Sequence, residues 1–422
     1  MQNILIIYPH WPPSNLAGVH RARLIANYLH DYNWHPIVLT VHPDFYEEKH
    51  DWDMLKTVSD TIEVHQVKAY KVGKPRIIGD IGLRAFLQLK KAALKLLKER
   101  EIKFIWIPIP SFYIAILGRL LYNKTKIPYG IDYIDPWVRD ISNRINLRSV
   151  LSLRIAKLLE PYAVKKACLI SGVSEAYYKP VLERNFKNKE IQHIGMPYGF
   201  DPNDHLIKIE NIKYPWDDFN ACIPYVYAGA FLPNSGLFID LLFKGLYKLK
   251  NENRLNERIK LFFIGTGNYS HKSISEYAKE NLVSEFIVEI RDRFPFLHVL
   301  NFLSAAKGVL LIGSTEKHYT ASKTFQSILS IRPVYSILHA ESTAVEIFKE
   351  CNADNYLVEY LEDEKTENFG IRIKNCFESF IIERSIYRTK LENIDKYSCR
   401  QSAFKLAQAI ENALNNQKNY CL

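Results

Sequence analysis

Residue types suited to anion binding gather between residues 313 and 334, in the sequence GSTEKHYTASKTFQSILSIRPV. The apolar run 308–312 before them predicts a buried strand, and apolar residues at helical spacing follow them. The polar part, 315–323, therefore joins the carboxyl end of a strand to a helix N-terminus, where open α/β sheets bind ligands. Helix N–H groups favour an anion there, Lys323 adds a positive charge, and Ser322 can cap the helix. The stretch predicts a phosphate site; an ordinary capped helix with a solvated lysine is the alternative.

The loop that follows the first predicted strand, residues 8–23, contains a glycine and arginines (YPHWPPSNLAGVHRAR). Gly18 permits close approach of the backbone to a ligand, and Arg21 lies at the start of the next helix. An arginine in that position, if it faces a cleft, binds a diphosphate through two parallel hydrogen bonds. Gly18 and Arg21 are therefore candidate donor-binding residues, with a solvated arginine as the alternative. No GxGxxG motif is present in this loop, so no dinucleotide is expected there.

Two carboxylates lie near the end of a further predicted strand, in the sequence PYGIDYIDPW. Asp132 and Asp135 can act as a base, as ligands of a sugar hydroxyl or as metal ligands. Their spacing of three places them on opposite faces of the strand, so only one of them can face a ligand from it. We take Asp135 as the candidate catalytic residue, and a cap of the following turn is its structural alternative.

The elements that must position these residues alternate between strand and helix, which predicts parallel sheets covered by helices. In the first half, strands are expected at 4–8, 36–41, 62–67, 104–107, 129–133 and 169–173, and helices at 22–29, 83–100, 115–122 and 147–167. The alternation of strands and helices restarts after a polar, proline-containing stretch. Strands are expected at 225–228, 260–264, 286–290, 308–312 and 334–338, and helices at 237–249, 273–281 and 297–306. The restart predicts domains at 1–205 and 221–395, a linker at 206–220, and a last segment, 396–422, with an amphipathic helix.

The stretch 313–334 resembles the donor-binding segment of GT-B glycosyltransferases, in particular the retaining, family-4-like group. In that family the helix runs to a G-x-P-V turn, which reads IRPV here, and a ribose-binding glutamate stands eight residues before the valine. Gln326 takes that position in this chain, and the motif's earlier glutamate falls on His318, with Glu316 nearby. The pair Ser322 and Lys323 resembles a variant of polysaccharide-building members. The sequences VS at 173–174 and YGFD at 198–201 resemble further family motifs.

The resemblance implies an α/β fold of the GT-B type, with two Rossmann-like domains that face each other across a cleft. The first domain would bind the acceptor, the second the donor, and the terminal helix would cross back to the first. The resemblance implies one set of donor-binding residues in the second domain: Gly229, Gly265, Gly267, Arg291, Thr320, Ser322 and Gln326. The family's usual Arg and Lys are absent from 229–240, so Lys323, Arg21 or Arg291 must supply the charge that holds the diphosphate.

The composition fits a globular protein with an anionic partner. The chain has 422 residues, 47% of them hydrophobic, and a net charge of +10. The six cysteines follow no metal-binding spacing, and no recognised nucleic-acid motif accompanies the charge. No apolar run of 18 residues is present, and prolines break the N-terminal apolar segment, so we expect a cytoplasmic protein. The predicted helix 83–100 has six basic residues and one acidic residue, and it can either lie on an anionic membrane or cover a sheet.

Together these features predict a metal-independent glycosyltransferase without a cofactor. It would move a sugar from a nucleotide-diphosphate sugar to a glycan or lipid-linked glycan, in surface polysaccharide biosynthesis. Two alternatives remain open. The missing Arg and Lys and the Gln326 replacement fit a catalytically degenerate subunit that supports an active partner. Asp135, Glu316 and His318 would suit the proton transfers of a sugar-nucleotide epimerase.

Overall fold

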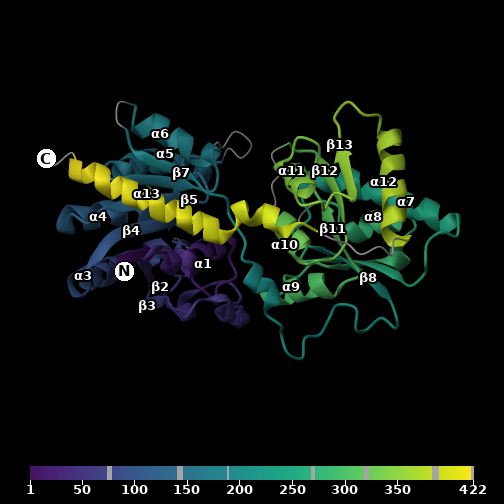
Figure 1. Cartoon of the computed structure of the whole chain (residues 1–422), viewed down its shortest axis with the longest axis horizontal. Coiled ribbons are helices and arrows are strands. Elements are labelled where there is room, and N and C mark those ends of the chain that lie inside the picture. Colours follow the sequence, from purple (N-terminus) through teal and green to yellow (C-terminus); the bar gives the residue numbers. More distant parts are fainter. Residues whose placement is uncertain are drawn as a thin grey trace. The chain divides into compact units, whose positions relative to one another are not determined.

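The computed structural model describes residues 1–73, 78–139, 146–187, 190–267, 271–317, 323–382 and 389–419 (Figure 1). The chain folds into two units, each built around its own sheet. The first unit contains Met1–Asp201 and Tyr397–Leu422, and the second contains Pro202–Lys396. The stretch 206–220, which the sequence suggested as a linker, therefore belongs to the second unit.

The first unit is built on a parallel sheet of seven strands in the order β3-β2-β1-β4-β5-β6-β7. The strands are β1 Gln2–Ile7, β2 Trp34–Val41, β3 Glu63–Val67, β4 Ile102–Ile109, β5 Tyr129–Tyr133, β6 Leu169–Gly172 and β7 Gln192–Gly195. Strand β4 reads IKFIWIPI, and only Lys103 in it is exposed, as expected for a strand covered on both faces. The chain runs from β1 to β2 on one side and later to β4 on the other, so the strand order reverses between β1 and β4.

Helices cover both faces of this sheet. They are α1 Ala17–Leu29, α2 Ile81–Arg84, α3 Phe86–Glu99, α4 Ala115–Thr125, α5 Leu147–Val164, α6 Glu175–Asn185 and α13 Cys399–Asn419. The connections from β3 to β4, from β4 to β5 and from β5 to β6 all cross the sheet in the same direction, toward β7. Because such crossovers are right-handed, α3, α4 and α5 lie on one face, and α4 contacts both neighbours.

The terminal helix α13 packs against α1 and against strands β6 and β7 of the first unit. Leu406 and Ile410 on its inner face are completely buried. At its start, the Cys399 N–H donates to the carbonyl of Phe200, at 2.9 Å. The prediction that the last helix returns to the first domain is confirmed.

The second unit contains a parallel sheet of six strands in the order β10-β9-β8-β11-β12-β13. Its elements are β8 Ile223–Ala228, α7 Gly236–Asn251, β9 Ile259–Ile264, α8 Ile274–Glu280, β10 Ile287–Ile290, α9 Phe296–Ala305, β11 Gly308–Ile312, α10 Lys323–Leu329, β12 Val334–His339, α11 Thr343–Glu350, β13 Tyr356–Tyr360 and α12 Thr366–Ile382. The strand order reverses here between β8 and β11. Aromatic side chains of α12, including Phe377 and Phe380, pack against Tyr335 of β12 and close the core on that side.

The basic segment 83–100, predicted as one helix, forms two. Ala85 has φ −102° and ψ 3°, so it interrupts the helix between α2 and α3, and Asp80 caps α2 by accepting from the Leu83 N–H at 2.7 Å. The buried side of α3 is small, with Leu89, Ala93 and Leu96. No helix among the described residues is long and apolar enough to cross a membrane.

Candidate functional site

In the second unit, glycines mark the carboxyl ends of the central strands β8 and β9. Gly229, directly after β8, has φ +124°, and Gly265, directly after β9, has φ +70°. Residues that carry a side chain rarely adopt these backbone φ angles, so glycine is needed at both turns. A Cβ on Gly229 would also overlap the Lys323 side chain. The backbone and a lysine therefore meet at the point where the strand order reverses, which is where open α/β sheets bind ligands.

Lys323 is the first residue of α10 and its ammonium group is held in a defined place. Its Nζ donates to the Tyr227 hydroxyl at 2.9 Å and to the Ala230 carbonyl at 3.0 Å. It also lies 4.6 Å from the centre of the Tyr227 ring, in a cation–π contact. Both hydrogen-bond acceptors are neutral oxygens, so these bonds orient the charge and do not cancel it.

Gln326 lies one helical turn after Lys323 and contacts a buried histidine. Its Oε1 is 2.5 Å from His205 Nε2, so the imidazole donates to the amide oxygen. Burial lowers the pKa of His205 to about 4, although the hydrogen bond to Gln326 opposes this shift. The imidazole is therefore neutral at pH 7 and fixes the orientation of the amide. The Gln326 nitrogen is then the group that can donate to a ribose hydroxyl.

The loop after β9 is tied to the loop after β10. Gly267, with φ +84°, donates its N–H to the Arg291 carbonyl, and the Arg291 Nε donates to the Gly267 carbonyl, both at 3.0 Å. Arg291 is thus anchored at the rim of the glycine turns while most of its side chain stays exposed. The predicted site residues Thr320 and Ser322, and His318, lie outside the described residues.

In the first unit, a cavity of about 710 Å³ opens at the carboxyl ends of the central strands. Its walls come from the loops after β1, β2, β4 and β5 and from α2, so it lies where the strand order reverses between β1 and β4. The following residues line it: Tyr8, His10, Leu16, Ala17, Gly18, Glu47, Glu48, Gly79, Asp80, Ile81, Arg84, Pro110, Ser111, Phe112 and Asp135. Its volume suits a small-molecule ligand, since such pockets usually measure about 300–1,000 Å³.

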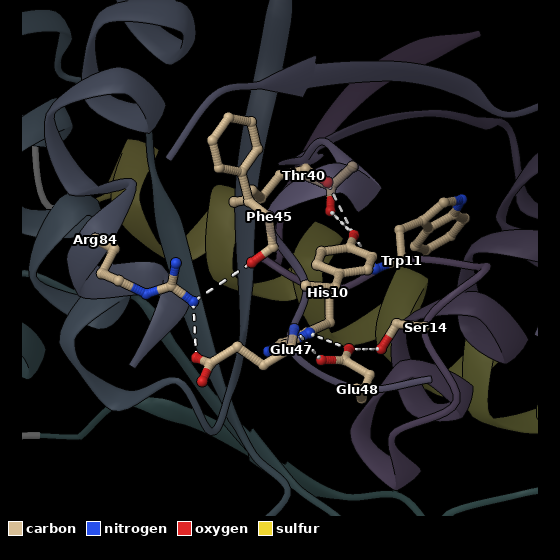
Figure 2. A network of polar contacts seen from close by, with 10 residues as sticks. His10, Trp11, Ser14, Thr40, Phe45, Glu47, Glu48 and Arg84 are labelled. Carbon is tan, nitrogen blue, oxygen red and sulfur yellow. Dashed lines mark hydrogen bonds and ion pairs between the residues drawn. The ribbon is translucent and has the colours of Figure 1, made fainter. Parts of the chain in front are cut away.

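Polar side chains form a connected network along one wall of this cavity (Figure 2). His10 Nδ1 lies 3.0 Å from Glu48 Oε1, and Arg84 donates to Glu47 Oε1, also at 3.0 Å. The Ser14 hydroxyl donates to the same Glu48 oxygen that contacts His10. Burial raises the pKa of Glu48, but the hydrogen bonds from His10 and Ser14 outweigh it and lower the pKa to about 2.

Two further carboxyls lie in the cavity. Asp80 accepts the Ser111 hydroxyl with both oxygens, at 2.7 and 2.8 Å. Burial raises the pKa of Asp135, and Arg139 at 3.5 Å opposes that shift. Beside Asp135, Trp137 stacks on Phe112 with ring centres 5.9 Å apart. Carboxylates beside aromatic rings can accept hydroxyl hydrogen bonds while a ring covers an apolar ligand face.

The structure gives Arg21 a different role from the one predicted. It is fully buried, and its guanidinium donates twice to Asp132, at 3.0 Å each, and to the carbonyls of Met196 and Pro197. No donor atom of Arg21 is left on the surface for a diphosphate. Gly18 lines the cavity, and a Cβ there would overlap the Tyr8 hydroxyl.

Four cavity residues were missed from the sequence: His10, Glu48, Asp80 and Ser111. His10 had a usable signal, since it lies three residues after β1 in the loop already singled out. The other three carried none, because they come from segments without regular periodicity. Among the residues that the structure describes, no group of three or more His, Cys, Asp or Glu side chains is placed to hold a metal ion.

Two Rossmann-like sheets with a terminal helix returning to the first unit define the GT-B fold. Three solved structures share it. HepE from Anabaena, in complex with UDP and glucose, has a TM-score of 0.58 at 13% identity, covering 98% of this chain and 100% of that one. A glycosyltransferase from Rickettsia africae has a TM-score of 0.59 at 15% identity, with 98% and 99% covered. A putative UDP-N-acetylglucosamine 2-epimerase from Listeria monocytogenes has a TM-score of 0.53 at 11% identity, with 98% and 97% covered.

No protein-family model matches the sequence. No curated protein is significantly similar to it. At the identities of the three solved structures, the likeness establishes the fold.

Proposed function

We propose that the protein is a glycosyltransferase that uses a nucleotide-diphosphate sugar and binds its acceptor in the cavity of the first unit. The observation that carries the proposal is the meeting of Lys323 with the glycine turns of Gly229 and Gly265. Glycine turns let a ligand approach the backbone closely, and a fixed ammonium group beside them suits a diphosphate. Solved structures of the same fold contain UDP or UDP-glucose, which supports this class of donor.

In this proposal the bond between sugar and diphosphate breaks without a metal ion. The diphosphate leaves with the bonding electrons, and Lys323 stabilises the negative charge that develops on it. Gln326, oriented by His205, donates to the ribose, and Arg291 lies where it can contact the nucleotide. Thr320 and Ser322 remain part of the proposed donor site.

The cavity of the first unit suits a sugar or glycan acceptor. Asp80, Glu48 and Asp135 offer hydroxyl acceptors, and Phe112 with its stacked Trp137 offers an aromatic surface. Polysaccharide biosynthesis is the pathway class that such an acceptor fits.

A lipid-linked acceptor is supported by the outer surface of α3 and α5. On α3, Leu87 is 62% exposed, and Phe86 and Leu94 are half-buried. On α5, Leu147 and Leu158 are 89% and 74% exposed, and they lie on one side of the helix together with Leu151 and Tyr162. The exposed cations of this helix are Arg148, Arg154 and Lys157, and its one acid, Glu160, is buried and paired with Arg184. Exposed leucines beside cations that have no acidic partner among the described residues fit an anionic bilayer surface.

The membrane proposal predicts binding to anionic vesicles. The protein should sediment with phosphatidylglycerol vesicles, but not with phosphatidylcholine vesicles, and salt should weaken the binding. The double change Leu151→Glu and Leu158→Glu should abolish it, and so should Lys90, Lys91 and Lys95 changed to Glu. Ile371→Glu, at an exposed apolar position of the second unit, is the matched control and should bind like the wild type. Equal binding to both vesicle types would refute an electrostatic membrane surface.

The donor proposal is tested by ligand-dependent melting. Each of a set of UDP-, GDP-, ADP- and TDP-sugars is added, and the melting temperature is measured against concentration. One of them should raise it progressively, because a ligand that binds only the folded state stabilises it by mass action. The shift should shrink in Lys323→Ala and persist in Lys307→Ala, which removes an exposed lysine at the opposite end of β11. The absence of any shift across the set would contradict the proposal.

A further inference from the structure

Trp52 is an exposed tryptophan on the first unit. All six tryptophans lie in the described part of the chain, and Trp52, at 60%, is the one whose side chain is exposed. Leu55, in the same short helix η3 Trp52–Thr57, is 46% exposed. Side chains three apart in a 3-10 helix lie on the same side, so the two residues form one apolar surface. Single exposed apolar residues are common, and the surroundings of Trp52 decide whether it binds a ligand.

A row of aromatic rings connects Trp52 with the cavity of the first unit. The Trp52 ring contacts His50 edge to face, with centres 5.5 Å apart, and His50 contacts Tyr46 in the same way at 6.0 Å. Tyr46 lies 5.3 Å from His10, which lines the cavity. Glu48, in the same loop as His50, also lies at the cavity wall (Figure 2). Trp52 is therefore the exposed end of a surface that begins inside the cavity.

Hydrogen bonds hold the segment around this tryptophan in place on both sides. Before it, the Asp51 N–H donates to the Pro13 carbonyl at 2.7 Å. After it, the carbonyl of Thr57 accepts from Arg23 at 3.1 Å and from Asn27 at 2.8 Å, both on α1. The indole ring is thus exposed but attached to a fixed backbone. A group positioned in advance loses less entropy when a ligand binds to it.

The charges near Trp52 favour a neutral ligand. The segment 42–60 contains six acidic residues and two basic ones. One of the two, Lys56, is paired with Asp53 at 2.8 Å. An anionic bilayer or an anionic polymer would be repelled by this segment. The surface around Trp52 therefore differs in charge from the basic outer surface of α3 and α5.

A sugar ring has the chemistry that such a surface can bind. One face of a pyranose presents C–H groups, and its hydroxyl groups lie around the rim. Tryptophan offers a large apolar face together with an N–H that can donate a hydrogen bond, so it suits ligands that are apolar on one side and wet on the other. An uncharged sugar also avoids the repulsion that the acidic segment 42–60 would impose on an anion.

We propose that Trp52 and Leu55 form a second subsite for the acceptor, which binds a neutral sugar behind the one that reacts. The terminal sugar occupies the cavity, and the chain behind it follows the row of rings and stacks on Trp52. The acceptor is then a neutral oligosaccharide or a growing polysaccharide, and a monosaccharide fills only part of the site. This inference rests on the proposed function for the assignment of the cavity to the acceptor.

Binding is tested on an array of neutral glycans that presents each sequence at lengths of one to four sugars. The wild type should bind at least one series more tightly as its length increases. Trp52→Ala should weaken binding of the longer members by ~10-fold or more, the scale of losing one aromatic anchor, and leave the monosaccharides unchanged. Trp52→Phe should keep most of the gain. The matched control is Phe404→Ala, which removes an exposed aromatic ring on α13, outside the cavity lining.

Fluorescence separates direct contact from an indirect effect of the substitution. The difference between the emission of the wild type and that of Trp52→Phe reports on Trp52. It should shift to shorter wavelength when a long glycan is added, because the ring leaves water, and should not shift with the monosaccharide. In turnover, Trp52→Ala should raise the KM for the long acceptor and leave kcat and the KM for the nucleotide sugar unchanged.

The outcomes distinguish this inference from the proposed function. If Trp52→Ala binds long glycans like the wild type, or if no glycan on the array binds more tightly than its monosaccharide, the subsite is refuted and glycosyl transfer is unaffected. If Trp52→Ala instead loses binding to phosphatidylglycerol vesicles, Trp52 is a bilayer contact and the subsite is refuted. If the wild type turns over no nucleotide sugar but its glycan binding depends on Trp52, glycosyl transfer is refuted and the sugar-binding surface stands.

Discussion

Gly229 determines where the Lys323 ammonium group can lie. Gly229→Ala would place a methyl group against the lysine stem and would strain the turn, because φ is +124°. We expect the Kd for UDP, measured by calorimetry, to rise at least ~10-fold, which corresponds to about 1.4 kcal/mol. Gly370→Ala is the control, since a Cβ there makes only an ordinary contact at 3.4 Å with Leu241. Unchanged UDP affinity in Gly229→Ala would separate the glycine turn from the donor.

Arg21 and Asp132 form a buried ion pair that joins α1 to β5. Removing one partner leaves an uncompensated buried charge, so Asp132→Asn should reduce the free energy of unfolding by about 3–5 kcal/mol in urea. The exposed pair of Lys179 and Glu175 is the control, and Lys179→Ala should cost less than about 1 kcal/mol. If Asp132→Asn kept full stability and lost UDP binding instead, a ligand role for Arg21 would be restored.

The low pKa of Glu48 makes the stability of the first unit sensitive to acid. Its folded-state pKa is about 2 against an ordinary value of 4.5, so its contribution is complete above about pH 5 and is lost as the pH falls toward 2. Glu48→Gln lacks this ionisation. Urea midpoints measured from pH 6 to pH 3 should therefore fall more steeply for the wild type than for the variant, and parallel curves would argue against the lowered pKa.

Local sequence predicted the site residues unevenly. Lys323 and the glycine turns could be singled out from the sequence because a strand, a polar loop and a helix follow one another directly. The role of Arg21 could not be predicted in this way, because its partners Asp132 and Met196 are more than a hundred residues away in the chain. The pairing of His10 with Glu48 depends in the same way on β1 lying beside β2, which only the folded sheet reveals.

At the scale of elements, buried parallel strands were the most predictable. The strand 129–133 was predicted with the bounds that the structure gives, and most others differ by one or two residues at the ends. β7 and β13 were missed because edge strands carry less continuous apolar sequence: β7 reads QHIG and β13 reads YLVEY. The break at Ala85 was missed because the helical period of 83–100 continues through it.

Because α13 packs on α1, substitutions at neighbouring positions of α13 should differ sharply in their effect on the free energy of unfolding. Ile410 is completely buried and Glu411 is exposed. Ile410→Ala should reduce the free energy of unfolding by about 2–5 kcal/mol, through lost burial and the cavity left behind. Glu411→Ala should change it by less than about 0.5 kcal/mol. Equal effects in urea unfolding would mean that the terminal helix contributes little to the first unit.

At the scale of the whole molecule, each of the two sheets presents a candidate site at the point where its strand order reverses. The second unit offers glycine turns and a held lysine, which suit a diphosphate. The first offers carboxylates, an oriented histidine and aromatic rings around a cavity, which suit hydroxyl groups. This division of chemical character between the units is the basis for proposing transfer of a sugar from a nucleotide to an acceptor.

The most direct test of this account is the turnover of a nucleotide sugar by Lys323→Ala and Lys307→Ala beside the wild type. We predict that Lys323→Ala lowers kcat by at least ~10²-fold, the scale of losing one group that stabilises the transition state, with an unchanged melting temperature. Lys307→Ala should keep the wild-type rate. Wild-type turnover in Lys323→Ala, or no turnover of any nucleotide sugar by the wild type, would contradict the account.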